Sequence, residues 1–201
     1  MKTNMLIIFF ILSCIFSSLA QASPIQNQVV QIAAGPYHSL VLKEDGTVWA
    51  WGLNNNGQLG DGTTANISKP VQVSGLSHVT MLTAGYHSLS LKEDGTVWAW
   101  GYNNWGQLGD GTTINRYRPV QVSDLSNVIM ISAGEYHSLA LKGDGSVWAW
   151  GYNGHGELGF GTTTDKKDLN RSLDFQILSR LLLESIIVWL YKMMVLSGHG
   201  D

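Results

Sequence analysis

The sequence predicts an all-β protein, an incomplete β-propeller of three four-stranded antiparallel blades of roughly 50 residues each. Two observations lead to this fold class. The string from Gly85 to Thr113 recurs with few changes at 35–64 and at 134–163. The histidines near the start of the copies lie 49 and then 50 residues apart. A period of this length is typical of supersecondary units that stack side by side and bury a shared core.

Each copy contains the material for one blade. Four runs in and after the second copy have the pattern of short strands: 87–91, 96–100, 119–122 and 128–131. The first two runs alternate polar and apolar side chains, as half-buried strands do, and this alternation places Trp98 and Trp100 on one face. Between them stands Asp94-Gly95, a pair favoured in tight hairpin turns in which both residues take positive φ.

A loop rich in asparagine and glycine follows the hairpin, from Asn103 to Thr113. Gly106, Gly109 and Gly111 are spaced through it. Glycine is favoured where the backbone must take positive φ or where a side chain would clash, so these residues are expected at sharp bends.

The repeated motifs AGxxHSLAL, DGTVWAWGxNxxGQLGxGT and PVQV resemble the regulator of chromosome condensation repeat over residues 29–168. The resemblance implies a seven-bladed propeller that binds partners. Some members of that family act as nucleotide exchange factors on small GTPases, and a secreted bacterial inhibitor of β-lactamases shares the architecture. Three copies cover less than half of such a ring.

The chain divides into three predicted regions. Residues 1–22 have the features of a secretory signal peptide, residues 23–168 hold the repeats, and residues 169–201 form a tail. The predicted repeats span 29–78, 79–127 and 128–168, the last being incomplete. The signal shows Lys2, an apolar core at 6–12 and the cleavage site Ala20-Gln21-Ala22. A lipoprotein signal ending at Cys14, the only cysteine, is the alternative.

The signal peptide predicts a secreted or periplasmic protein without a membrane segment after cleavage. Because Cys14 would be removed with the signal, the mature chain would lack disulfides. The net charge is −3, which gives no electrostatic basis for nucleic-acid binding. The expected partner is a protein, bound through the loops of the propeller face.

The tail is predicted to be out of frame. When the third base of each codon is joined to the first two bases of the next, residues 186–201 permit HSLALQDDGTVWAWG, a further copy of the repeat. In this shifted frame, the codons of Met193-Met194-Val195 can encode only Asp-Gly. The hidden histidine falls in register, 49 places after His137. These matches predict a frameshift near residues 168–171 and a truncated product.

Candidate binding residues are those that differ between otherwise similar copies, because variable loop positions on a constant scaffold are where specificity resides. One loop position is Asn56, Trp105 or His155 in the three copies. Arg116 and Tyr117 differ from their counterparts in the same way. Trp105 has two interpretations: an exposed interface anchor, or a cover for the neighbouring blade.

No catalytic, metal-binding or cofactor-binding constellation is predicted. His38, His87 and His137 occupy the same place in every copy, which indicates a structural role, expected to be a bond to a backbone group inside each blade. The glycine-rich loops lack the Lys-Ser/Thr ending of a phosphate-binding loop. An enzyme with a site in the central channel is the alternative function. A nucleotide exchange role conflicts with the predicted signal peptide, because its GTPases are intracellular.

Overall fold

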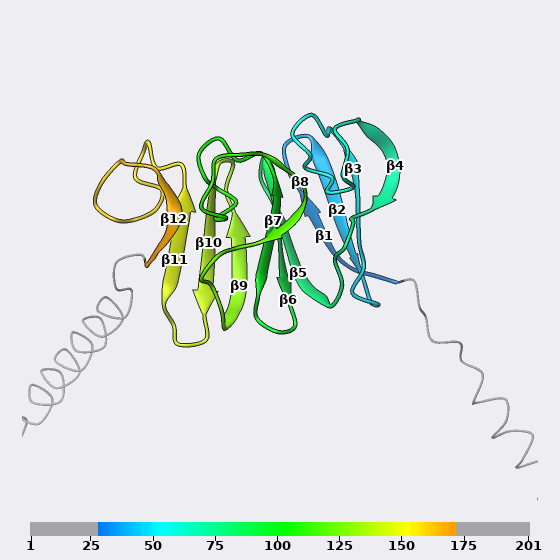
Figure 1. Ribbon diagram of the computed structural model, residues 1–201. Coiled ribbons are helices and arrows are strands. Elements are labelled where there is room, and N and C mark those ends of the chain that lie inside the picture. Colours follow the sequence, from blue (N-terminus) through cyan, green and yellow to red (C-terminus); the bar gives the residue numbers. More distant parts are fainter. Residues whose placement is uncertain (1–27, 172–201) are drawn as a thin grey trace, which may run out of the picture.

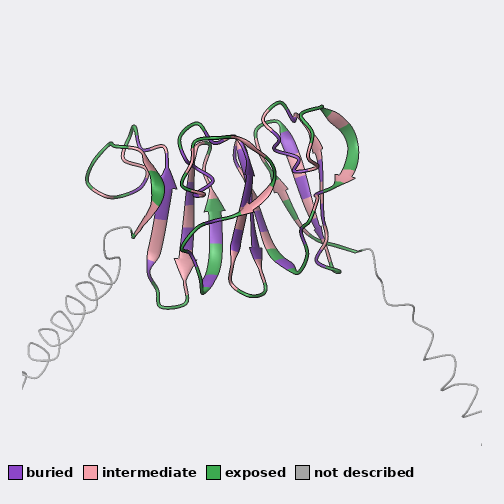
Figure 2. Ribbon diagram, in the orientation of Figure 1, coloured by how far each residue is buried: buried purple, intermediate pink, exposed green. Residues whose placement is uncertain are grey.

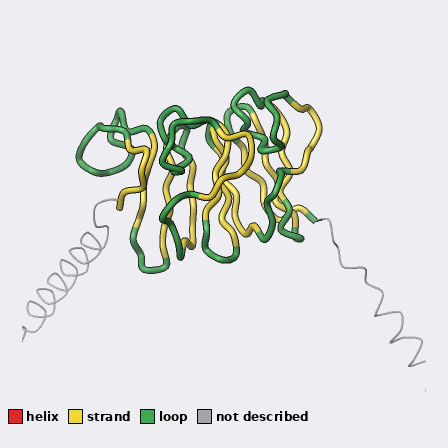
Figure 3. The backbone as a smooth tube through the Cα atoms, in the orientation of Figure 1, coloured by secondary structure: helices red, strands yellow, loops and turns green. Residues whose placement is uncertain are grey.

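The computed structural model describes residues 28–171, which contain twelve strands and no helix (Figures 1 and 3). The predicted signal peptide at 1–22 lies outside the described residues. So does the tail from residue 172 onward, and neither prediction is tested by the structure.

The strands group into three sheets, each formed by four consecutive strands. The first blade contains β1 (Val29–Ala34), β2 (His38–Lys43), β3 (Val48–Gly52) and β4 (Ile67–Gln72). The second contains β5 (Val79–Ala84), β6 (His87–Lys92), β7 (Val97–Gly101) and β8 (Arg116–Gln121). The third contains β9 (Val128–Ala133), β10 (His137–Lys142), β11 (Val147–Gly151) and β12 (Lys166–Arg171).

Neighbouring strands in every sheet are antiparallel, and the three sheets stand side by side in sequence order (Figure 1). This arrangement confirms the predicted fold class of an incomplete propeller with three four-stranded blades. Strand β12 pairs with β11 as far as Arg171, three residues beyond the repeat boundary expected at 168. Leu169, inside this extension, packs against the core shared with the second blade.

The hairpin turns differ from the prediction at one residue. Gly46, Gly95 and Gly145 have φ of 75°, 75° and 81°, but the aspartates before them are not among the described residues with positive φ. The turn is longer than two residues: the Gly95 N–H donates to the Lys92 carbonyl and the Lys92 N–H donates to the Thr96 carbonyl. Only the glycine therefore takes the left-handed conformation, as in a turn followed by a glycine bulge.

The aspartate of each hairpin has a different task. Asp94 accepts hydrogen bonds from the backbone N–H and the hydroxyl of Thr96. These bonds are the largest cause of a lowered pKa for the Asp94 carboxyl. The aspartate thus fastens the turn through its side chain.

The hydrophobic core lies between the blades rather than inside any one of them (Figure 2). Trp100 is fully buried in the cluster shared with the first blade, and Trp98 packs against the same cluster. This confirms that the two indoles lie on one face of the second blade. On the opposite face, Leu89 and Val97 belong to the cluster shared with the third blade. The second blade therefore contributes to two cores, and its strand β7 has side chains in both.

A polar relay crosses each interface between blades. The Nε2 atom of His38 lies 2.8 Å from the Ser88 hydroxyl, which donates to the Gln58 carbonyl at 2.9 Å. The Trp100 indole N–H donates to the same carbonyl. At the next interface the relay is repeated by His87, Ser138, Gln107 and Trp150, with distances of 2.7–2.8 Å.

The relay corrects the predicted partner of the histidines. His38 and His87 are buried and structural, but they bond a serine hydroxyl of the next blade rather than a backbone group of their own. A buried imidazole needs a partner, and stacking of the blades supplies one. Burial lowers the pKa of His38 to about 4 and that of His87 to about 3, so both rings are neutral near pH 7.

Candidate functional site

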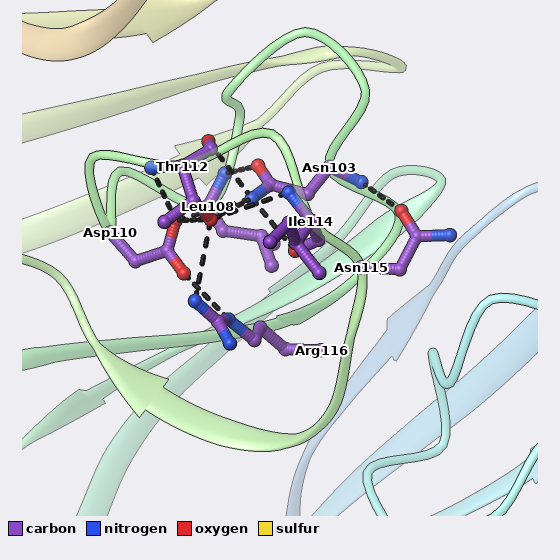
Figure 4. Close-up of polar contacts among 7 residues, drawn as sticks. All are labelled: Asn103, Leu108, Asp110, Thr112, Ile114, Asn115 and Arg116. Carbon is purple, nitrogen blue, oxygen red and sulfur yellow. Dashed lines mark hydrogen bonds and ion pairs between the residues drawn. The ribbon is translucent and has the colours of Figure 1, made fainter.

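The loops at one edge of the arc carry most of the variable residues, and a buried asparagine holds each loop in shape. In the second blade, the Asn103 side chain accepts the Leu108 N–H at 2.9 Å (Figure 4). Its amide group donates to the carboxylate of Asp110 at 3.2 Å and to the carbonyls of Thr112 and Ile114 at 3.1 and 3.0 Å. One side chain therefore forms hydrogen bonds with donors and acceptors from across the loop.

Arg116 has an internal partner in the same loop. Its Nε atom donates to an Asp110 carboxylate oxygen at 2.7 Å (Figure 4). Burial opposes ionisation of Asp110, but hydrogen bonds from Thr112 and Arg116 outweigh it and lower the pKa of the carboxyl. The pair closes the end of the loop, so this predicted binding residue has a structural contact that its sequence variation did not reveal.

The first and third blades use the same anchor. Asn54 and Asn153 are fully buried and accept the N–H groups of Leu59 and Leu158 at 3.0 and 2.9 Å. The glycines of these loops have positive φ, as expected; in the second blade the values are 76°, 66° and 74° at Gly106, Gly109 and Gly111. The three loops therefore form similar scaffolds on which single positions vary.

Aromatic rings follow one another across this edge from blade to blade. Tyr37 meets Tyr86 edge to face with ring centroids 5.9 Å apart, and Tyr86 stacks on Tyr136 at 4.7 Å with 10° between the planes. Tyr136 also contacts Tyr102 and Tyr152 at 5.9 and 6.3 Å. We call the following set the aromatic row: Tyr37, Tyr86, Tyr102, Trp105, Tyr136, Tyr152 and His155.

The end of the aromatic row borders a cavity of about 530 Å³ between the second and third blades. Its lining consists of Tyr102, Trp105, Glu135, Tyr136, His137, Tyr152, His155 and Glu157. Two predicted binding residues, Trp105 and His155, thus come together at one site. The Trp105 ring lies 5.1 Å from that of Tyr152 in the next blade and is still 39% exposed. Both interpretations of Trp105 are therefore compatible with its position.

The remaining predicted residues lie outside this lining. Asn56 accepts a hydrogen bond at 3.1 Å from Asn115 of the second blade, which ties two neighbouring loops together. Tyr117, on β8, is 47% exposed and lies beside Gly57 of the first blade. A Cβ at Gly57 would collide with the Tyr117 ring and backbone. Both residues contribute to contacts between the first two blades.

Glu157 is a cavity residue that the sequence analysis did not single out. It replaces Gln58 and Gln107 of the other copies, and this change of GQLG to GELG was the available signal. One carboxylate oxygen accepts the His155 N–H at 2.9 Å, and the other lies 3.1 Å from the His155 ring. Partial burial opposes ionisation of Glu157, but these and other hydrogen bonds lower the pKa of its carboxyl. The third blade thus adds a negative group to the cavity.

Within residues 28–171, no group of three or more histidine, cysteine, aspartate or glutamate side chains is placed to hold a metal ion. Over the same range there is no helix long and apolar enough to cross a membrane.

The fold and its repeated loops define a propeller-type interaction or regulatory module. The RCC1-like domain model matches residues 14–186, and the chain belongs to this family. Human HERC2, an E3 ubiquitin-protein ligase, is 48% identical over 50 residues, which are 25% of this chain and 1% of HERC2. Human protein RCC2 is 43% identical over 47 residues, which are 23% of this chain and 9% of RCC2.

A solved structure extends the likeness over more of the chain. The crystal structure of human WBSCR16 has a TM-score of 0.65 and 28% identity over 74% of this chain and 39% of that one. The chain therefore spans only a small part of the curated relatives it matches, and well under half of this structural neighbour.

Proposed function

We propose that this chain is a secreted binding module that engages a protein partner through the edge bearing the aromatic row. The observation that carries the proposal is the cavity lined by Trp105, Tyr152 and their neighbours. Aromatic side chains are enriched in the centres of protein interfaces, where they bury a large area at low entropic cost. Here they project from loops that buried asparagines hold in place, so little ordering would be needed on binding.

The charge of the cavity indicates which partner surface would fit. Glu135 and Glu157 line it together with His137 and His155. An aromatic wall beside carboxylates suits a partner that presents an apolar or aromatic residue next to a basic one. Three lining residues, Trp105, His155 and Glu157, stand at positions that differ between the copies, as expected for recognition.

The binding experiment compares two substitutions in the 201-residue chain. Trp105→Ala is expected to weaken capture of partners from the extracellular or periplasmic fraction by about tenfold or more, because a central aromatic anchor is lost. Ile114→Ala is the control, since Ile114 is 62% exposed on the same loop but does not line the cavity. Equal capture by Trp105→Ala and the unsubstituted chain would refute the proposed site.

An enzyme with its site in this cavity is the second candidate. The His155–Glu157 contact favours it, because a histidine oriented by a carboxylate is a common acid–base arrangement. Against it, the His155 side chain is 83% exposed, and the cavity lining contains no serine, threonine, cysteine or lysine. Turnover of a small substrate that is lost in His155→Gln would support catalysis over binding.

Export is a separate part of the proposal. If residues 1–22 form a signal peptide, the exported chain begins at Ser23. N-terminal sequencing of the exported protein tests this, and a chain that retains Met1 would contradict it. Sequencing of the source DNA through codons 168–201 tests the predicted frameshift and truncation in the same way.

A further inference from the structure

The outer face of the first blade exposes residues whose equivalents are buried in the other blades. Ile32 is 76% exposed, whereas Leu82 and Ile131 at the same strand position are 3% and 6% exposed. Val29 is 46% exposed, against 5% and 4% at the matching valines. We call this surface the leading face; it comprises Val29, Ile32, Ser39, Val41 and Trp51. In the second and third blades the corresponding surface packs on the preceding blade.

The outer face of the third blade is the complementary half of the same interface. Leu139 and Val147 are half-buried, whereas Leu89 and Val97, their equivalents, are fully buried against the third blade. We call this surface the trailing face; it comprises His137, Leu139, Leu141 and Val147, together with the Glu157 carbonyl, the equivalent of the Gln58 and Gln107 carbonyls that accept from the next blade.

Each face also carries one half of the polar relay that joins neighbouring blades. The trailing face offers the His137 ring and the Glu157 carbonyl, and the leading face offers the Ser39 hydroxyl and the Trp51 indole. Among the described residues, no side-chain hydrogen bond satisfies His137, Ser39 or Trp51. The relay has formed twice within the chain, with matched donors, acceptors and distances, and its two unpaired halves lie at opposite ends of the arc.

We propose that a second copy of this chain docks its leading face on the trailing face of the first, head to tail. His137 would then bond the partner's Ser39, and the partner's Trp51 would donate to the Glu157 carbonyl. The partner's Tyr37 would lie beside Tyr136, as Tyr86 does within the chain, and would extend the aromatic row. The interface repeats the two that already join the blades, so its apolar and polar groups match without rearrangement.

The head-to-tail geometry of the contact limits which assemblies can form. The two faces are different surfaces, so the contact is heterologous and generates either a closed ring or a longer chain of copies. Burial of the exposed apolar side chains drives the association, and the hydrogen bonds of the relay fix its register.

The test measures the mass of the full-length chain by sedimentation velocity from about 1 to 100 μM. The unsubstituted chain is expected to form dimers or larger species as its concentration rises. Ile32→Asp blocks the leading face and Leu139→Asp blocks the trailing face, and each should weaken association about 100-fold or more, because a carboxylate would be buried without a partner. Ile114→Asp is the control, since this isoleucine is also largely exposed, at 62%, but lies on the middle blade.

The decisive step mixes the two blocked variants. Each keeps one intact face, so Ile32→Asp and Leu139→Asp should form a one-to-one heterodimer and nothing larger, a result that non-specific aggregation does not give. Circular dichroism checks that the variants are folded, and Val147→Asp replaces Leu139→Asp if that variant is not. A monomeric unsubstituted chain at every concentration, two blocked variants that do not pair, or a control that dissociates equally would each overturn the proposal.

Discussion

At the scale of single residues, the buried histidines show how a repeat turns one side chain into a joint between blades. The His87 ring is hydrogen-bonded to a serine hydroxyl that belongs to the next repeat. The serine hydroxyl also donates to a backbone carbonyl, so in this relay it accepts from the histidine. The neutral imidazole must then be the donor, and a depressed pKa follows from its removal from water.

Stability is therefore expected to depend on pH in a defined window. Burial lowers the pKa of His38 to about 4 and that of His87 to about 3, whereas an unfolded histidine titrates near about 6.5. Between these values the unfolded chain binds more protons, so the free energy of unfolding falls as the pH falls. The contribution is complete above about pH 6.5 and is lost progressively toward pH 4 for His38 and toward pH 3 for His87.

Urea denaturation at about pH 7 and pH 5 measures this effect, with an expected loss of roughly 2 kcal/mol for each buried histidine. His87→Gln should remove its share of the pH dependence, because its side chain does not titrate. His155→Gln is the control, since His155 is largely exposed. The prediction fails if His87→Gln keeps the pH dependence of the parent.

The loop anchor is a second single-residue determinant. Asn103→Ala removes five hydrogen bonds from a fully buried site and leaves the Leu108 N–H without its acceptor. The free energy of unfolding should fall by about 2–4 kcal/mol. Asn104→Ala is the matched control, because Asn104 is exposed and should change stability by less than about 0.5 kcal/mol. Chemical denaturation of both variants measures the two changes in the free energy of unfolding and tests this prediction.

At the scale of the elements, the turns between the first two strands of each blade lie close together. Gly35, Gly85 and Gly134 occupy equivalent positions in these turns, and none has positive φ. A Cβ at Gly35 would collide with the Gly85 carbonyl oxygen, and a Cβ at Gly85 would collide with that of Gly134. At Gly35 and Gly85 the neighbouring blade therefore requires glycine, whereas at Gly134 the atoms in the way belong to the His137 ring of the same blade.

Gly85→Ala is accordingly expected to lower the free energy of unfolding by more than about 2 kcal/mol, since backbone must move to admit the methyl group. Gly143→Ala provides the comparison. A Cβ there meets nothing closer than 3.7 Å, and the other two copies have glutamate at this position. Thermal unfolding followed by circular dichroism should give a lower midpoint temperature for Gly85→Ala than for Gly143→Ala. Equal midpoints would show that the turns of neighbouring blades can move apart to admit the methyl group.

At the scale of the whole molecule, stability comes from interfaces between blades. Trp51, Trp100 and Trp150 occupy equivalent strand positions, but among the described residues only Trp100 and Trp150 pack on a preceding blade and are fully buried. Trp100→Ala and Trp150→Ala should each cost about 3–5 kcal/mol. Trp51→Ala should cost less than about half as much when measured at low protein concentration. Denaturant titrations of the three variants test this, and three equal losses would contradict the placement of the core between the blades.

Much of the architecture follows from local patterns that the sequence displays directly. Three such patterns are the repeat period, the alternation of polar and apolar residues around Trp98 and Trp100, and the glycines of the long loops. Each can be recognised within a single repeat or by comparing one repeat with the next. The partner of His87 does not, because Ser138 lies 51 residues away and repetition alone does not state which blade supplies the contact. The hairpin aspartate was assigned positive φ from the Asp-Gly pair, whereas the bonds to Thr96 favour the longer turn.

The candidate site was predictable in part. Trp105 and His155 were marked by their variation and do meet at the cavity. Arg116 varies as well, yet its charge is matched inside the loop by Asp110, which sequence variation cannot distinguish from a binding role. The tyrosines of the aromatic row come from separate turns and become neighbours only when the blades pack.

The unbroken order of strands within each sheet has a consequence for folding during synthesis. Every blade is completed by one contiguous stretch of chain, and no strand waits for a distant segment before it can pair. Contacts of short sequence separation favour fast folding, and domains tend to fold as the chain emerges, from the N-terminus onward. Each finished blade would then present its face to the next one leaving the ribosome, so the arc can assemble in order, one blade at a time.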